Sequence, residues 1–112
     1  MTISVLMKCE SMISTKNFYS DILGFNVVDS AGNTLTVEKE GGRLIFTEHD
    51  LWNVGSGISG TVYFAIQNVN DYFNSIKDKS VVIWPLENTP YGSREFGVKD
   101  VNGYYLAFAQ RN

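Results

Sequence analysis

The sequence predicts an α+β fold made of two copies of a βαβββ module. Three observations lead to this prediction. Short runs alternate between apolar and polar residues, as half-buried strands do. Two longer runs have helical periodicity, with capping residues at their ends. The order strand, helix, strand, strand, strand then occurs twice along the 112 residues, which is the signature of an internal duplication.

The first module is predicted over about residues 1–48. Ile3–Cys9 has the pattern of a short apolar strand, and a helix is expected over about Ser14–Leu23. Ser11 or Ser14 would cap this helix and Gly24 would end it. The separators between the later strands contain Gly, which accepts positive φ in tight turns. The remaining strands of the module are expected at Phe25–Asp29, Thr34–Lys39 and Arg43–Thr47.

The second module is predicted over about residues 60–110 and repeats the same order. Thr61–Ile66 is expected to form a strand and Val69–Lys77 a helix, with Asn68 or Asn70 as its cap. Three further strands are expected at Val81–Leu86, Arg94–Lys99 and Tyr104–Ala109. Alternation gives these strands one large apolar face and one face of small, polar and aromatic groups. The second kind of face is suited to a ligand cavity.

Composition restricts the class of protein. With 44% hydrophobic and 19% charged residues, the chain is neither disordered nor a coiled coil, and its length predicts a single domain over residues 1–112. A net charge of −3 argues against nucleic-acid binding, which needs clustered Lys and Arg. No apolar run is long enough to cross a membrane, and the N-terminus lacks the basic start of a signal peptide. The single cysteine, Cys9, forms no internal disulfide, so we expect a cytoplasmic protein.

Two segments resemble motifs of the glyoxalase / bleomycin-resistance / extradiol-dioxygenase superfamily, whose fold is called vicinal oxygen chelate. Residues 17–25 (NFYSDILGF) resemble its FYxxxLGF motif. Residues 91–106 (YGSREFGVKDVNGYYL) resemble its G-x-R-E-F-x-x-x-D-P-x-G-x-x-L ending, with Val101 where the family commonly has Pro. The resemblance covers nearly the whole chain. It implies that the two modules form one curved, mixed eight-stranded sheet with helices on its outer face, and that the protein is a homodimer.

The resemblance also allows a test for the metal centre of the family's enzymes. Such enzymes hold one divalent ion with His, Glu or Gln at four equivalent strand positions. In this sequence these positions correspond to Ser4, Ile45, Thr61 and Ala107. None of the four is a usual ligand of a divalent metal, and two are hydrocarbon. His49 and Glu48 are the nearest conventional ligands, and we interpret them as parts of a solvated turn. We therefore expect no metal and no cofactor.

The aromatic residues divide into a core set and a candidate binding set. The expected core rings are Phe18, Phe25, Phe46, Phe64, Phe73 and Phe108. The candidate ligand-binding residues are Trp52, Tyr63, Trp84, Tyr91, Phe96 and Tyr105, together with Arg43. Rings on a cavity face can stack on a planar ligand, at about 0.5–1.5 kcal/mol each beyond burial. The alternative is that some of these rings contact a dimer partner, because Trp and Tyr are enriched at interfaces.

Carboxylates for acid–base chemistry are present at Glu38, Glu40 and Glu95, but the sequence places no two of them in one site. Arg94 and Glu95 are adjacent on a predicted strand, so their side chains should point to opposite faces.

These observations favour non-catalytic binding and sequestration of a small, largely planar molecule, as in the metal-free, bleomycin-resistance-like branch of the superfamily. Antibiotic resistance would be the associated role. The alternative is a lyase, isomerase or dioxygenase-type enzyme with non-standard metal ligands or none. A third reading is a dimeric scaffold whose cavity no longer binds.

Overall fold

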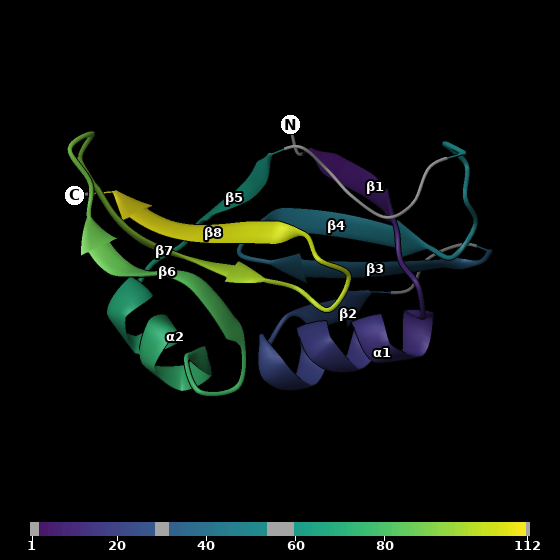
Figure 1. The fold of residues 1–112 in the computed structure, drawn as a ribbon, viewed down its shortest axis with the longest axis horizontal. Coiled ribbons are helices and arrows are strands. Elements are labelled where there is room, and N and C mark those ends of the chain that lie inside the picture. Colours follow the sequence, from purple (N-terminus) through teal and green to yellow (C-terminus); the bar gives the residue numbers. More distant parts are fainter. Residues whose placement is uncertain (1–2, 29–31, 54–59, 112) are drawn as a thin grey trace. The chain divides into compact units, whose positions relative to one another are not determined.

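A computed structural model describes residues 3–28, 32–53 and 60–111 (Figure 1). The chain divides into two compact units, Met1–Gly57 with Val101–Gly103 and Ile58–Asp100 with Tyr104–Asn112. Within the described residues each unit has one set of strand, helix and three strands. The predicted α+β class and the predicted duplication of the βαβββ module are both confirmed.

The first unit contains one mixed sheet with the strand order β1-β4-β3-β2. Its strands are β1 (Ser4–Lys8), β2 (Asn26–Val28), β3 (Thr34–Lys39) and β4 (Gly42–Thr47). β1 runs parallel to β4, and the other neighbours are antiparallel. The helical segment consists of α1 (Met12–Asn17) followed directly by η1 (Phe18–Ile22), a turn of π-helix.

The first helix starts at Met12, two residues earlier than predicted, because two side chains cap its N-terminus. The Ser11 hydroxyl accepts a hydrogen bond from the Ser14 N–H at 3.2 Å. The Glu48 carboxylate accepts one from the Met12 N–H at 2.8 Å. Free N–H groups at a helix start need such acceptors. Of the two predicted caps, Ser11 is the one used, and Glu48 has a structural role instead of lying in a merely solvated turn.

The second unit contains a mixed sheet with the order β5-β8-β7-β6. Its elements are β5 (Thr61–Ala65), α2 (Val69–Ile76), β6 (Val81–Asn88), β7 (Ser93–Lys99) and β8 (Tyr105–Arg111). Asn68 precedes α2 as predicted, but it has a left-handed φ of 55° and its side chain makes no capping hydrogen bond. Instead, the Val69 N–H donates to the side-chain oxygen Oε1 of Gln110 at 2.9 Å.

The strand registers of the two sheets show the duplication residue by residue. β1 pairs with β4 through Ser4↔Arg43 and Leu6↔Ile45. β5 pairs with β8 in the same way, through Thr61↔Tyr105 and Tyr63↔Ala107. Ser4 is therefore equivalent to Thr61, and Ile45 to Ala107, as the sequence predicted. The eight expected strands are present in the described residues as two four-stranded mixed sheets, one in each unit.

The core of the second unit lies between its sheet and α2. Phe96 and Phe108 are paired across β7 and β8 and are both fully buried. Two rings from α2 pack on them: Tyr72 lies 4.9 Å from Phe108 and Phe73 lies 5.0 Å from Phe96, measured between ring centroids. Edge-to-face contacts of this kind add to the burial energy. α2 thus covers one face of the sheet (Figure 1), and the opposite face is available for a site.

Candidate functional site: a pocket on the second sheet

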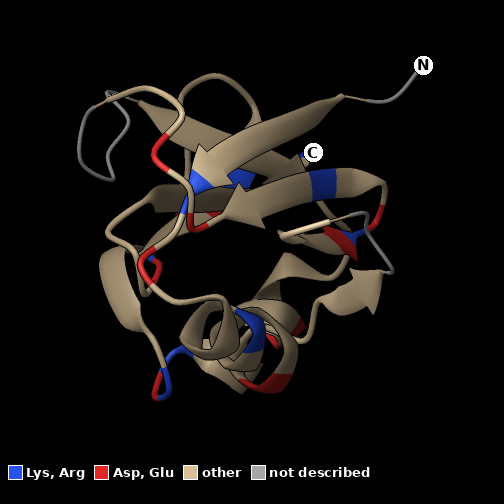
Figure 2. Cartoon of the chain, turned by 90° about the vertical axis from the view of Figure 1, so that its right-hand side faces the viewer, with Lys and Arg blue, Asp and Glu red and all other residues tan. Residues whose placement is uncertain are grey.

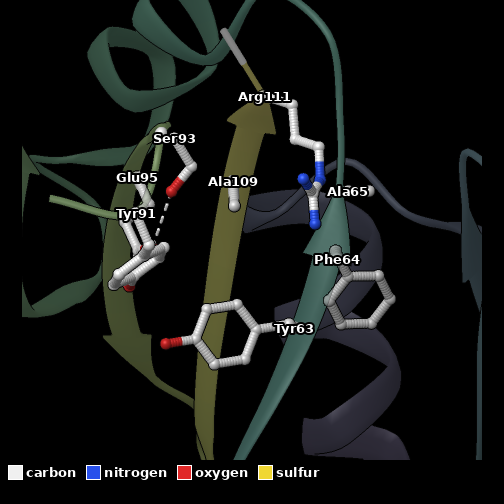
Figure 3. A pocket seen from close by; sticks show the side chains of 9 residues that line it. Tyr63, Phe64, Ala65, Tyr91, Ser93, Glu95, Ala109 and Arg111 are labelled. Atoms are coloured by element: carbon white, nitrogen blue, oxygen red, sulfur yellow. Dashed lines mark hydrogen bonds between the residues drawn. The ribbon is translucent and has the colours of Figure 1, made fainter. Parts of the chain in front are cut away.

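A cavity of about 240 Å³ lies on the face of the second sheet opposite α2 (Figure 3). All of its lining residues belong to the second unit. They are Tyr63, Phe64, Ala65, Tyr91, Gly92, Ser93, Glu95, Ala109 and Arg111.

The hollow follows from the residues that the sheet brings into one row. Ala65 of β5 pairs with Ala109 of β8, and Ala109 pairs with Glu95 of β7. Two methyl groups therefore lie side by side where larger side chains would fill the space. Tyr63 lies two residues before Ala65, so it projects from the same face. In Figure 3 the Tyr63 ring extends over β8 with its hydroxyl toward Tyr91, which bounds the other side.

Glu95 is a buried carboxylate held by two hydroxyl groups. Only 2% of its surface is exposed. Its Oε1 atom accepts a hydrogen bond from the Tyr91 hydroxyl at 2.6 Å and another from the Ser93 hydroxyl at 3.1 Å. Such partners are what a buried charge requires. The Ser93 hydroxyl lies 2.9 Å from the Thr89 hydroxyl, which extends the network into the turn before β7.

The same contacts change the chemistry of Tyr91. The hydrogen bond to the Glu95 carboxylate is the main cause that raises the pKa of Tyr91 above its ordinary value, and the nearby Tyr63 hydroxyl acts in the same direction. A phenol next to a carboxylate keeps its proton, because losing it would bring two negative charges together. Tyr91 therefore remains a hydrogen-bond donor throughout the physiological pH range.

Arg111 supplies the positive charge of the pocket. In Figure 3 its side chain returns from the end of β8 and its guanidinium lies beside Ala65. This side chain makes no hydrogen bond or ion pair with any described residue. The pocket thus has a held carboxylate at one end and an unengaged guanidinium at the other.

Two of the predicted ligand-binding residues, Tyr63 and Tyr91, line the pocket. Trp84 and Tyr105 belong to the same sheet but lie outside the lining. The Trp84 ring covers Gly97, where an added Cβ would come within 2.6 Å of three ring atoms. Trp84 therefore fills the neighbouring part of this face and leaves the hollow above Ala65 and Ala109 open.

The placement of Phe96 on the cavity face needs correction. Phe96 is fully buried on the side of α2, in contact with Phe73 and Phe108. The remaining two predicted residues belong to the first unit and are not among the residues that line this pocket. Arg43 forms an ion pair with Glu38 at 2.8 Å, and Trp52 follows β4 with 45% of its surface exposed.

Several pocket residues were missed by sequence reasoning. The sequence names Glu95 as a candidate for acid–base chemistry and predicts that its side chain and that of Arg94 point to opposite faces of the strand. This prediction is confirmed, because the Arg94 Nε donates to Asn70 of α2 at 2.7 Å, whereas Glu95 lies in the pocket. Arg111 was missed because the last strand was predicted to end at Ala109. The strand continues to Arg111, and alternation along β8 then places Ala109 and Arg111 on one face.

The residues at the positions of the superfamily's metal ligands do not fit a divalent ion. The methyl and sec-butyl side chains of Ala107 and Ile45 have no donor atom. In the described part of the chain, no three His, Cys, Asp or Glu side chains come together as a metal site would need. The His49 Nε2 atom lies 3.2 Å from the side-chain nitrogen of Asn33. We therefore assign no chemistry through a metal.

Positively and negatively charged residues are mixed along the described part of the chain (Figure 2). Blue and red segments are interspersed along the ribbon in Figure 2. No helix in the described residues has the length and apolar character needed to cross a membrane.

Comparison with known proteins identifies the fold. No family model matches the sequence, and no curated protein matches it. Solved structures do match. A glyoxalase/bleomycin resistance protein/dioxygenase superfamily member from Sphaerobacter thermophilus has a TM-score of 0.82 at 16% identity, over 99% of this chain and 97% of its own. The chain has the glyoxalase fold.

Two further solved structures show a comparable level of similarity. A glyoxalase/bleomycin resistance protein/dioxygenase from Alicyclobacillus acidocaldarius has a TM-score of 0.76 at 14% identity, covering 99% of this chain and 91% of its own. TioX from a Micromonospora species has a TM-score of 0.79 at 17% identity, covering 100% of this chain and 99% of its own. At these identities the similarity establishes the fold, and the resemblance inferred from the two sequence motifs is confirmed at that level.

Proposed function

We propose that the protein binds and sequesters a small, largely planar molecule in the pocket of its second sheet. The observation that supports this is the hollow of about 240 Å³ above Ala65 and Ala109, bounded by the rings of Tyr63 and Tyr91. A volume below the usual range for drug-sized ligands favours a compound of one or two rings. Antibiotics of that size are one class of ligand that would suit such a protein.

The physical basis is stacking over a floor of small side chains. A flat ring placed over Ala65 and Ala109 would contact their methyl groups and the edge or face of Tyr63. Each aromatic contact contributes about 0.5–1.5 kcal/mol beyond burial. The lining offers no metal ligand set, so the energy of binding would come from ring contacts and from the polar groups at the two ends.

The test is a screen of planar compounds by thermal shift, followed by titration of the hits against two variants. A ligand that binds only the folded protein must raise its melting temperature. Tyr63→Ala should weaken binding at least tenfold. The matched control is Tyr105→Ala, because Tyr105 projects from the same sheet face but lies outside the lining. Equal losses in both variants, or in neither, would contradict the proposal.

A second candidate is metal-free acid–base chemistry on the bound molecule. It is favoured by the contact between the Glu95 carboxylate and the Tyr91 hydroxyl, since a positioned carboxylate can act as a base. The two candidates differ in the fate of the ligand. Sequestration returns the compound unchanged after denaturation of the complex, whereas an enzyme converts it during incubation and loses that conversion in Glu95→Gln.

A further inference from the structure

The two charged groups of the pocket lie at opposite ends of one row across the sheet. Ala65, Ala109 and Glu95 are consecutive partners on three neighbouring strands. Strand spacing places Ala65 and Glu95 about 10 Å apart. The Arg111 guanidinium lies beside Ala65 (Figure 3), so the row has positive charge at the β5 end and negative charge at the β7 end.

The β7 end is prepared to accept a hydrogen bond. Tyr91 and Ser93 both donate to Oε1 of Glu95, while Oε2 accepts nothing from the described residues. An ionised carboxylate only accepts hydrogen bonds. A ligand atom at this end must therefore be a donor, and a second anionic group would be repelled by a carboxylate that is 98% removed from solvent.

The β5 end of the row offers hydrogen-bond donors and a positive charge, through the guanidinium of Arg111. A guanidinium only donates hydrogen bonds, keeps its charge at all relevant pH values and matches a planar carboxylate in its geometry. Arg111 is not engaged by any described residue, so the approach of an anion displaces no existing partner. A simple organic cation would be attracted by Glu95 but repelled by Arg111.

We propose that the ligand of this pocket is a flat aromatic acid with a hydrogen-bond donor at its far end: an amino- or hydroxy-substituted, fused-ring carboxylate. Its anionic group lies at Arg111, its rings lie over Ala109, and its donor contacts Glu95. The fused ring provides the length that the row requires. This inference rests on the proposed function, since it specifies the ligand class of the same pocket.

The experiment is equilibrium dialysis with four naphthalene probes of one shape. They are 6-amino-2-naphthoate, 2-naphthoate and the methyl esters of both, which remove the donor, the charge or both. The amino group should improve affinity about tenfold, as expected for a hydrogen bond to a buried charge. The carboxylate should improve it about threefold over the ester, because Arg111 is solvent-exposed.

Two variants assign each preference to its side chain. Glu95→Gln places an amide N–H₂ where the amino probe needs an acceptor, so the preference for the amino group should disappear while the preference for the carboxylate remains. Arg111→Gln should do the reverse. The matched controls remove one charge each from the same sheet outside the lining: Glu87→Gln, beside Glu95 on β6, and Lys99→Gln on β7. Both controls should keep both preferences.

The outcomes separate this inference from the proposed function. If all four probes bind equally and Tyr63→Ala weakens the binding of all four, the pocket binds planar molecules. The inference that it selects a carboxylate at Arg111 and a hydrogen-bond donor at Glu95 is then overturned. If the controls alter the preferences as much as Glu95→Gln and Arg111→Gln do, the inference is overturned as well. If none of the four probes binds, the inference about the ligand class is overturned, and the proposed function is decided separately by the thermal-shift screen of planar compounds.

Discussion

Replacing Ala109 by Leu should close the pocket while leaving the fold intact. Ala109 lies at the centre of the row between Ala65 and Glu95, and its methyl group forms the floor of the cavity. Leu adds three heavy atoms above that floor. A stacked ring needs about 3.5–4.0 Å of clearance from the atoms below it. The Leu side chain takes up this clearance, so the ring and the side chain cannot occupy the hollow together.

The effect can be separated into affinity and stability. Affinity for 6-amino-2-naphthoate should fall at least tenfold, equivalent to about 1.4 kcal/mol. Stability should change by no more than about 0.5 kcal/mol, because Ala109 faces the open side of the sheet and Leu suits a strand. Fluorescence titration of the probe and urea denaturation measure the two quantities. Thr61→Leu, on the same face of β5 but outside the lining, is the control. Unchanged affinity in Ala109→Leu would refute the reasoning.

Three further predictions concern the contacts around the site and the first unit. Gly97→Ala should cost about 1–3 kcal/mol and shift the Trp84 emission, because the new methyl group would meet the indole ring at 2.6 Å. Asn102→Ala should cost about 1–2 kcal/mol in urea denaturation, since this side chain accepts from Glu10 N–H and donates to the Thr15 hydroxyl, each at 3.1 Å; an unchanged midpoint would count against it. Tyr91→Phe should lower stability equally from pH 6 to pH 9, and the difference should shrink above about pH 10. The folded state raises the pKa of Tyr91, so its contribution is complete below the ordinary value of 10.0 and is lost as the pH rises through the raised pKa; a constant difference up to pH 11 would disagree.

Much of the fold could be predicted because its determinants are local. The hydrophobic periodicity of each helix or strand, the helix caps and the glycine turns each depend on residues that are close together in the sequence. The internal duplication then provides the same pattern a second time. The equivalence of Ser4 with Thr61 followed from that repeat and is confirmed by the registers. The helix start at Met12 was misplaced because part of its cap comes from Glu48, which is remote in sequence.

The site was predicted less completely, because it depends on pairing between strands. Alternation shows that Glu95 and Phe96 face opposite sides but not which side is covered. The pairing of Phe96 with Phe108, beneath α2, decides this. In β6 the alternation itself is broken by register shifts on both sides of Trp84. Nothing in the sequence marks Ala65 and Ala109 as the floor of a pocket, because they form one only by lying next to each other on paired strands.

The fold and the function differ in what supports them. The fold rests on the strand order, the duplication and the similarity to solved structures. The proposed function rests on a row of small residues between a held carboxylate and an unengaged guanidinium. A binding measurement alone would not show that this row is where a ligand lies.

The most direct test of the binding site is therefore a map of backbone amide chemical shifts during titration with 6-amino-2-naphthoate. The account predicts that the changes centre on Ala65, Ala109 and Ser93, and that Ala109→Leu abolishes them. Shifts confined to the first sheet, around Ser4 and Arg43, would contradict the account, as would a titration that leaves the amides of the second sheet unchanged.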